Sequence, residues 1–171
     1  ELEHPTDKRV YAIAEAFEQG YTIDDIHERT RIDRWFLQRL HRIHLFKEAL
    51  RAHDGDGSQP LPEEVLREAK RMGFSDFQIA ELTMTRSDSP MFDRMLRIRE
   101  MRKGMGILPC VKQIDTLAGE YPAQTNYLYL TYNGDKHDLE YERDHRSVIV
   151  LGSGAYRIGS SVEFDWCGVN T

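Results

Sequence analysis

The sequence has few cysteines and no long hydrophobic run. Only two cysteines, Cys110 and Cys167, occur among its 171 residues, which is too few for a disulfide scaffold or a cysteine-based zinc site. We therefore expect a reducing, cytoplasmic setting. No apolar run approaches the ~20 residues that a membrane helix needs, so we expect no membrane partner. The opening residues 1–5 lack the basic and apolar regions of a signal peptide.

Positive charge is also in short supply. The sequence has 23 Lys and Arg residues against 29 Asp and Glu residues, a net charge of −6. This balance argues against nucleic acid as a partner. The 40% share of hydrophobic residues is typical of a globular protein. The length suits one domain, or one domain with part of another.

Residues 6–104 show helical periodicity with recognisable start and stop signals. The expected starts are Thr6, Thr22 with Asp25 as its capping partner, Asp33, Pro62, Ser75 and the region of Pro90. The expected stops are Gly20, Gly73 and Gly104. The expected buried faces are Val10, Ile13, Ala14 and Phe17; Ile23 and Ile26; Phe36, Leu37, Leu40, Ile43, Phe46 and Leu50; and Val65, Leu66 and Ala69. The run from His53 to Pro60 predicts a solvated loop that does not pack.

An internal repeat occurs within this helical region. Thr22, Ile26 and Thr30 match Ser75, Ile79 and Thr83 at one constant offset, and Arg42-Ile43 match Arg97-Ile98 after a two-residue insertion. Two copies are fewer than the three or more that solenoids need. We therefore predict two related helical hairpins that pack together.

The periodicity changes after residue 110. Residues 111–115 predict a short strand, residues 126–132 predict an aromatic strand that ends at Asn133-Gly134, and residues 135–146 predict a charged linker. The apolar run 148–151 is typical of a strand buried on both faces of a parallel sheet. A loop with Gly152, Gly154 and Gly159 and a helix follow. We predict a mainly α fold divided into residues 1–134, a linker at 135–146, and the first βα unit of an α/β domain at 147–171.

The glycine loop is the clearest candidate for a ligand-binding site. A strand that enters Gly-x-Gly and leaves into a helix can place a phosphate on the helix N-terminus. Here Gly159 lies one residue later than the dinucleotide pattern requires, which favours a generic strand-to-helix turn. Glu163 and Asp165 follow the loop; they could act as bases or line a polar passage, or simply interact with the helix dipole.

Histidine and cysteine offer weaker candidates. His41 and His44 lie three residues apart on one helical face, but no further ligand has metal-like spacing. We therefore predict no metal site. Cys110 and Cys167 are expected to be buried rather than nucleophilic, and no catalytic residue is assigned.

A helix-turn-helix binding module is the alternative interpretation of the helical pairs. Arg34, Arg39 and Arg42 would line one reading helix. The second repeat would supply another, with Arg94, Arg97, Arg99 and Arg102. The acidic total argues against this alternative, since arginines opposite an apolar face usually form a solvated surface.

The strand at 148–151 has no neighbour in the sequence that follows. A parallel strand followed by a helix needs a second strand beside it. Each large apolar side chain of this unit would contribute ~1.5–3 kcal/mol when buried. We therefore expect the chain to be a piece of a longer polypeptide.

Several segments resemble the large chain of carbamoyl phosphate synthetase. The resemblance rests on residues 32–37 (Ile-Asp-Arg-Trp-Phe-Leu), residues 111–118 (Val-Lys-Gln-Ile-Asp-Thr-Leu-Ala) with 120–122 and 125–129, and residues 149–169 around the glycine loop. It covers the chain from about Arg9 onward. Ser160-Ser161 and Lys112 to Asp115 are more similar to the animal-type branch.

The resemblance implies a helical oligomerisation domain followed by the start of the second synthetase half. It implies self-association, flanking synthetase halves in the same chain, and a glutaminase subunit or domain. ATP and Mg²⁺ would bind elsewhere in the full-length enzyme, with no cofactor or activity in this fragment. By motif match, Arg157, Ile158, Gly159, Ser161 and Glu163 would border the passage that carries carbamate between active sites.

Overall fold

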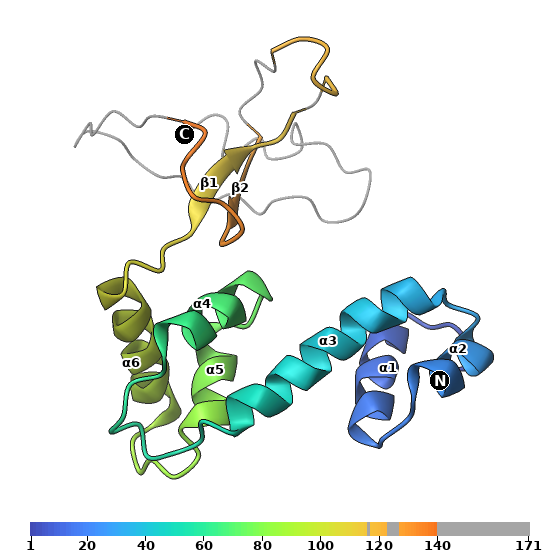
Figure 1. Ribbon diagram of the computed structural model, residues 1–171, viewed down its shortest axis with the longest axis horizontal. Helices are drawn as coiled ribbons and strands as arrows, with labels where there is room; N and C mark the ends of the chain where they lie inside the picture. Colours follow the sequence, from blue (N-terminus) through green and yellow to red (C-terminus); the bar gives the residue numbers. More distant parts are fainter. Residues whose placement is uncertain (116, 123–126, 140–171) are drawn as a thin grey trace, which may run out of the picture. The chain divides into compact units, whose positions relative to one another are not determined.

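The fold is mainly α-helical, as predicted from the sequence. A computed structural model describes residues 1–115, 117–122 and 127–139, and the predicted βα unit at 147–171 lies outside these residues. The described elements, shown in Figure 1, are α1 (Arg9–Glu18), α2 (Ile23–Thr30), α3 (Arg34–Arg51), α4 (Glu63–Arg71), α5 (Asp76–Thr83), α6 (Met91–Gly104), β1 (Cys110–Gln113) and β2 (Leu128–Thr131). The chain divides into two units, residues 1–138 and 139–171. None of the helices in the described ranges is long and apolar enough to cross a membrane.

Side-chain caps start three of the helices where the sequence predicted them. The Thr22 hydroxyl accepts from the Asp25 amide at 3.1 Å, and the Asp25 carboxylate accepts from the Thr22 amide at 2.9 Å. Ser75 and Gln78 form the same reciprocal pair ahead of α5. Asp33 accepts from the amide of Trp35 at 2.8 Å. These bonds satisfy amides that have no partner inside the helix.

The prediction that Thr6 caps the first helix is wrong. The residue preceding α1 is Lys8, which makes no side-chain cap. The Thr6 carbonyl instead accepts from the amide of Arg9 at 3.2 Å, and its hydroxyl accepts from the amide of Lys8 at 3.3 Å. Thr6 thus closes a turn that precedes the helix.

The first half of the internal repeat is confirmed in three dimensions. Ile26 and Ile79 are both fully buried. The Thr30 hydroxyl donates to the Ile26 carbonyl at 2.7 Å, and the Thr83 hydroxyl donates to the Ile79 carbonyl at 2.8 Å. α2 and α5 are therefore equivalent helices in two related hairpins.

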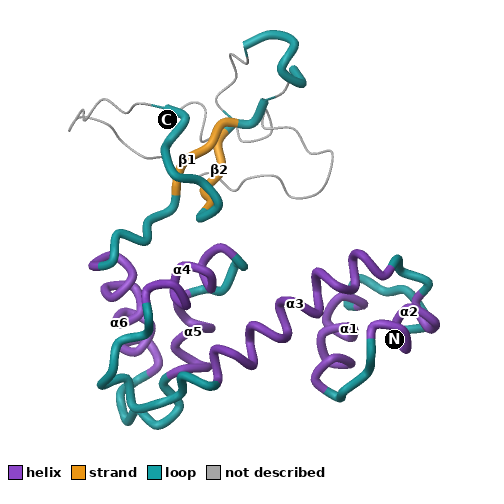
Figure 2. Tube along the Cα trace, viewed as in Figure 1, coloured by secondary structure: helices purple, strands orange, loops and turns teal. Residues whose placement is uncertain are grey.

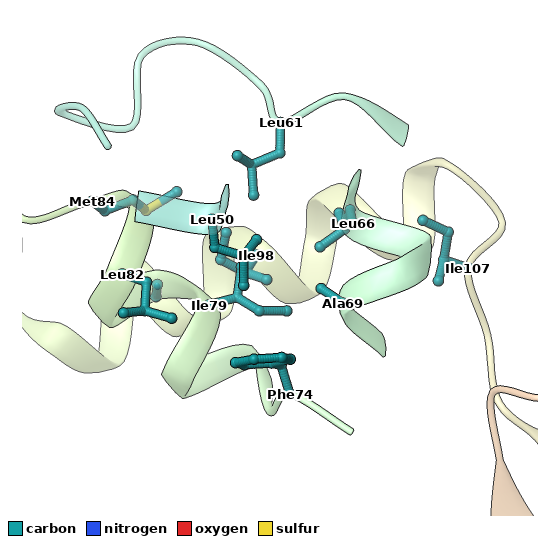
Figure 3. Close-up of a cluster of buried hydrophobic side chains, with 11 residues drawn as sticks. Leu50, Leu61, Leu66, Ala69, Phe74, Ile79, Leu82, Met84, Ile98 and Ile107 are labelled. Atoms are coloured by element: carbon teal, nitrogen blue, oxygen red, sulfur yellow. The ribbon is translucent and has the colours of Figure 1, made fainter. Parts of the chain in front are cut away.

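The hydrophobic side chains form two separate cores. The first core contains Ile13, Ala16, Phe17, Ile26 and Leu37. The second core contains Leu50, Leu61, Leu66, Ala69, Phe74, Ile79, Ala80, Leu82, Met84, Ile98 and Ile107 (Figure 3).

α3 is the helix common to both cores. It supplies Leu37 to the first core and Leu50 to the second. Figure 2 shows α3 as one uninterrupted helix between these points. Thirteen residues of helix separate the two anchors by about 20 Å, so the middle of α3 lies between the cores.

Several residues expected to be buried are exposed. Val10 and Ala14 of α1 lie on the surface, although the prediction had placed them in the core. Phe36 and Ile43 of α3 are likewise exposed. α1 contributes Ile13, Ala16 and Phe17 to the first core, and its apolar face is wider than this buried part. The rest of that face, with Val10 and Ala14, lines an apolar groove.

The loop after α3 packs against the second hairpin, contrary to the prediction for residues 53–60. The Asp54 carboxylate accepts from the amide of Thr85 at 2.8 Å. The Gly55 amide donates to the Thr83 carbonyl at 3.1 Å, and the Gly55 carbonyl accepts from the backbone amide of Arg86 at 3.1 Å. Polar backbone and a carboxylate, rather than apolar side chains, hold this loop in place.

β1 and β2 pair antiparallel, with Val111 opposite Leu130 and Lys112 opposite Tyr129. We call this pair the ribbon. The Asp138 amide donates to the Val111 carbonyl at 3.0 Å, and the Val111 amide donates to the His137 ring at 3.0 Å. The segment expected as a linker thus begins with residues that bind β1, while residues 140–146 lie outside the described residues.

Candidate interaction surfaces

An apolar groove of about 310 Å³ lies over the middle of α3. Residues of α1 and α3 line it together with Phe74 and residues of α5. Its apolar lining consists of Val10, Tyr11, Ala14, Leu40, Ile43, Phe74 and Leu82. Val10 and Ala14 of α1 and Ile43 of α3, which sequence analysis had placed in the core, therefore come together on one surface, whereas Phe36 does not line the groove.

Charged side chains of both signs lie around the apolar groove. Lys47 and Glu18 form an ion pair that joins α3 to α1, and Glu81 of α5 also lines the groove. The hydrogen bond and charge of Lys47 lower the pKa of the Glu18 carboxyl below its ordinary value. These charges leave the rim polar and the floor apolar.

His41 and His44 contact Phe17 of the first core. Their ring centroids lie 4.8 Å and 6.1 Å from that of Phe17. The two histidine rings stack on each other at 5.9 Å. Across the described ranges, no group of three or more His, Cys, Asp or Glu side chains is placed to hold a metal ion.

A second pocket, of about 470 Å³, is lined largely by charged and polar side chains from α3, α4 and the segment after β2. We call it the arginine pocket. Its lining residues are Arg39, Arg42, Ile43, Glu68, Arg71, Met72, Asn133 and Asp135. Arg42 donates to Glu68 at 2.7 Å, and the Arg39 guanidinium lies 4.8 Å from the Trp35 ring centroid.

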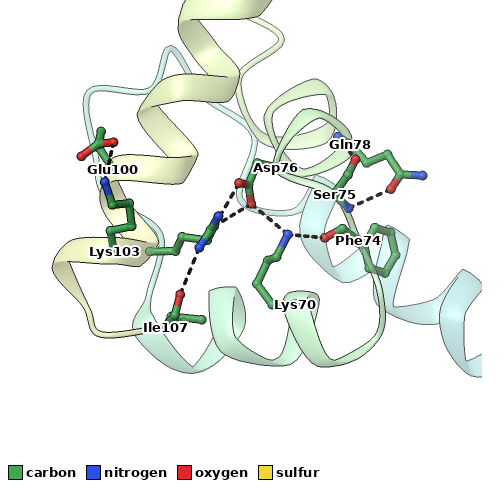
Figure 4. A network of polar contacts seen from close by, with 9 residues as sticks. Lys70, Phe74, Ser75, Asp76, Gln78, Glu100, Lys103 and Ile107 are labelled. Carbon is green, nitrogen blue, oxygen red and sulfur yellow. Dashed lines mark hydrogen bonds and ion pairs between the residues drawn. The ribbon is translucent and has the colours of Figure 1, made fainter. Parts of the chain in front are cut away.

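Three charged side chains form a network between α4, α5 and α6 (Figure 4). The side chains of Lys70, Asp76 and Arg102 are 7%, 14% and 12% exposed. Lys70 donates to the Asp76 carboxylate at 2.8 Å, and Arg102 donates to both of its oxygens at 2.9 and 3.0 Å. Lys70 also donates to the Phe74 carbonyl at 2.8 Å. The network therefore ties three helices together at the edge of the second core.

The Asp76 carboxyl has a pKa below its ordinary value. Burial opposes this by favouring the neutral form, but the hydrogen bonds and charges of Lys70 and Arg102 outweigh burial. The carboxylate is therefore ionised across the neutral range, as the two cations require.

Tyr132 connects this ion network to the ribbon. Its ring centroid lies 5.0 Å from the Lys70 ammonium and 5.7 Å from the Arg102 guanidinium, within cation–π range. Burial raises the pKa of the Tyr132 hydroxyl. The neighbouring Asn133 amide donates to the Arg71 carbonyl at 3.3 Å. Two successive residues after β2 thus bind the helical part.

The ribbon itself exposes large apolar side chains on both faces. The residues concerned are Ile114, Tyr127, Leu128, Tyr129 and Leu130. Successive strand residues point to opposite faces, so neither face of β2 is covered by the described residues. A strand that is apolar on both faces is typical of one enclosed on both sides.

The arginines of the helix-turn-helix interpretation make contacts within the chain. Arg34 pairs with Asp24 at 2.6 Å, and Arg42 pairs with Glu68. Arg94 donates to the Met84 carbonyl at 2.8 Å. Arg102 belongs to the ion network. Four of the seven arginines are therefore engaged by groups of the chain itself.

The predicted site residues lie largely outside the described part of the chain. Gly152, Gly154, Arg157, Ile158, Gly159, Ser161, Glu163, Asp165 and Cys167 are all outside the described residues. Cys110 is buried, as predicted, and its thiol donates to the Gly134 carbonyl.

Sequence reasoning missed the ion network and its contact with Tyr132. The one available signal was local, because Lys70 and Asp76 flank the stop at Gly73. The distant members Arg102 and Tyr132 carried no such signal, because only the fold brings them close.

Comparison with known proteins identifies the family. Residues 1–106 match the family of the carbamoyl-phosphate synthetase large chain, oligomerisation domain, and residues 144–171 match the carbamoyl phosphate synthase preATP-grasp domain. The first match covers more than half of the sequence. The chain therefore belongs to the carbamoyl-phosphate synthetase large-chain family, which confirms the resemblance found in the sequence.

Individual relatives agree along nearly the whole chain. The multifunctional protein URA2 of Saccharomyces cerevisiae is 53% identical over 170 residues, which is 99% of this chain and 7% of the relative. The multifunctional protein CAD of Squalus acanthias is 49% identical over 169 residues, which is 99% of this chain and 7% of the relative. The mitochondrial carbamoyl-phosphate synthase [ammonia] of Rattus norvegicus is 46% identical over 172 residues, or 100% and 10%. The chain thus spans a small part of these relatives' length.

Proposed function

We propose that this chain is a noncatalytic oligomerisation and scaffold segment within the large chain of a carbamoyl phosphate synthetase. The complete enzyme would make carbamoyl phosphate from bicarbonate, ammonia and ATP, with ATP and Mg²⁺ bound by flanking synthetase halves. Arg157, Ile158, Gly159, Ser161 and Glu163 would border the carbamate passage. The family of residues 1–106 supports the scaffold role.

The apolar groove is the observation that carries self-association. A contiguous apolar surface with a polar rim marks an interaction site. The occupant we propose is a second copy of this chain, because the matched family is one of oligomerisation domains. A twofold contact must be self-complementary, and the rim carries charges of both signs, Glu81 and the Lys47–Glu18 ion pair.

Light scattering at increasing protein concentration tests self-association. We expect the mass of the 171-residue chain to rise above that of a monomer. Tyr11→Glu should return the mass to the monomer value, because it places a charge in the groove at a residue that is 73% exposed. This exposure means that the substitution leaves the cores intact.

Leu45→Glu is the matched control. Leu45 lies on α3 and is 55% exposed, but it does not line the groove. It should leave the concentration dependence unchanged. A wild-type chain that stays monomeric, or equal loss of association in both variants, would contradict the assignment of this groove.

Two further assays address the noncatalytic role and the binding-module alternative. The isolated chain, supplied with ATP, Mg²⁺, bicarbonate and ammonia, should form no carbamoyl phosphate. It should also show no salt-dependent retention on nonspecific DNA. Product formation would refute the scaffold assignment, and retention would favour the binding module.

A further inference from the structure

Two arginines of the arginine pocket have no carboxylate partner among the described residues. Arg34, Arg42, Arg51, Arg67 and Arg86 each pair with an acidic side chain. Arg39 and Arg71 take part in no such pair in the described part of the chain, yet both line the same pocket. Two guanidinium groups without an ion-pair partner among the described residues therefore line one concave surface, in a chain whose net charge is −6.

The environment of each side chain suits a bound anion. Arg39 stacks on Trp35 at 4.8 Å, which restricts its guanidinium before any ligand arrives. Asn133 donates to the Arg71 carbonyl, so the pocket side of α4 is joined to the segment after β2. Ile43 and Met72 add apolar surface beside the charges.

We propose that the arginine pocket binds a phosphate-bearing small molecule, with Arg39 and Arg71 holding the phosphate. Two guanidinium groups balance the charge of a phosphate dianion, and their planar N–H groups match its oxygens in pairs. Ile43 and Met72 contact the remainder of the ligand. The pocket volume of about 470 Å³ lies within the range of small-molecule sites. The pocket adjoins the apolar groove, since Ile43 lines both, but the two arginines do not line the groove.

Glu68 and Asp135 limit the affinity of the site. Both carboxylates line the pocket, and Glu68 holds Arg42 at 2.7 Å. A phosphate must therefore compete with Glu68 for the third guanidinium. Removing the Glu68 carboxylate should therefore tighten phosphate binding, whereas removing an arginine should weaken it.

Calorimetric titration of the 171-residue chain with inorganic pyrophosphate, at low ionic strength, tests the site. We expect saturable binding. Arg39→Gln and Arg71→Gln should each weaken it about tenfold, the effect of losing one hydrogen bond to a charged group. Glu68→Gln should tighten binding, because Arg42 is released.

Arg67→Gln is the control, since Arg67 lies on α4 with Arg71 but pairs with Glu63 and does not line the pocket. It removes the same charge and should leave the affinity unchanged. The proposal is overturned if binding does not saturate, if all three arginine variants weaken it equally, or if Glu68→Gln weakens it. Succinate serves as the carboxylate comparison, and tighter binding of succinate than of pyrophosphate would overturn the phosphate assignment.

Discussion

Asp76 neutralises two cations in a site that has little access to water. Asp76→Asn would leave Lys70 and Arg102 largely buried without their counter-charge. We expect a loss of about 3 kcal/mol in the free energy of unfolding, as for other broken buried ion pairs. Urea denaturation measures this. Asp24→Asn removes the exposed partner of Arg34 and should cost less than about 1 kcal/mol; equal losses would refute the special role of burial.

The same carboxylate predicts a pH dependence. Its pKa is lowered in the folded state, so its contribution is complete above the ordinary aspartate value of about 4. The contribution is lost as the pH falls through the lowered folded pKa. Stability measured from neutral pH downward should therefore fall less steeply in Asp76→Asn than in the wild type. Other carboxylates with lowered pKa values, such as Asp54 and Asp138, remain as a common background.

Gly57 and Gly20 form a matched pair for testing how the loop packs. Their φ angles are 82° and 86°, so alanine strains the backbone at both. A Cβ atom at Gly57 would also lie 3.2 Å from Met84 Sδ and from an Arg97 guanidinium nitrogen, whereas at Gly20 nothing lies within 4 Å. Gly57→Ala should lower the thermal midpoint more than Gly20→Ala. Equal shifts of the thermal midpoint in the two variants would show that Met84 and Arg97 move away from the added Cβ atom without a cost in stability.

At the scale of elements, the two hairpins agree in their short helices and differ in their long ones. Ile98 of α6 is fully buried, whereas its repeat partner Ile43 of α3 is 42% exposed. Ile98→Ala should cost about 2–5 kcal/mol, as for other buried isoleucines, and Ile43→Ala should cost far less. Thermal or urea unfolding checks this difference, and similar losses at both positions would contradict the two-core arrangement.

Three helix starts followed from the sequence because they depend on local chemistry, whereas the start predicted at Thr6 did not. The hydroxyl and carboxylate caps at Thr22, Asp33 and Ser75 bond to amides two or three residues away, so they can be recognised from neighbouring residues in the sequence. The buried faces were harder to predict. α1 and α3 have apolar faces wider than their contacts, and periodicity alone cannot show that Val10 and Ile43 form a groove.

At the scale of the whole molecule, Tyr132 is one of two successive residues that join the ribbon to the helices, and Asn133 is the other. A two-stranded ribbon is only marginally stable by itself. In Tyr132→Ala, amide hydrogen exchange in β1 and β2 should become about tenfold faster, given the loss of its packing and cation–π contacts. Tyr132→Phe keeps the ring and should exchange like the wild type. Unchanged exchange in the alanine variant would show that other contacts hold the ribbon.

The candidate surfaces were beyond the reach of sequence reasoning for a related reason. The arginine pocket combines residues of α3 and α4 with Asn133 and Asp135, which are far apart along the chain. Sequence analysis considered Arg39 and Arg42 only within the alternative of a DNA-reading helix, against which the acidic total argued. It had correctly identified the family, because residues 32–37 and 111–118 are distinctive as written.

Because both cores are fastened to α3, the turn of this helix sets the angle between them. Inserting a single alanine between Arg42 and Ile43 would rotate everything beyond it by about 100° and advance it by about 1.5 Å. Each core would survive, but the surfaces shared between them would come apart. The number of residues in α3 thus fixes the relative orientation of the two cores. Only insertions of close to a whole number of turns would preserve that orientation.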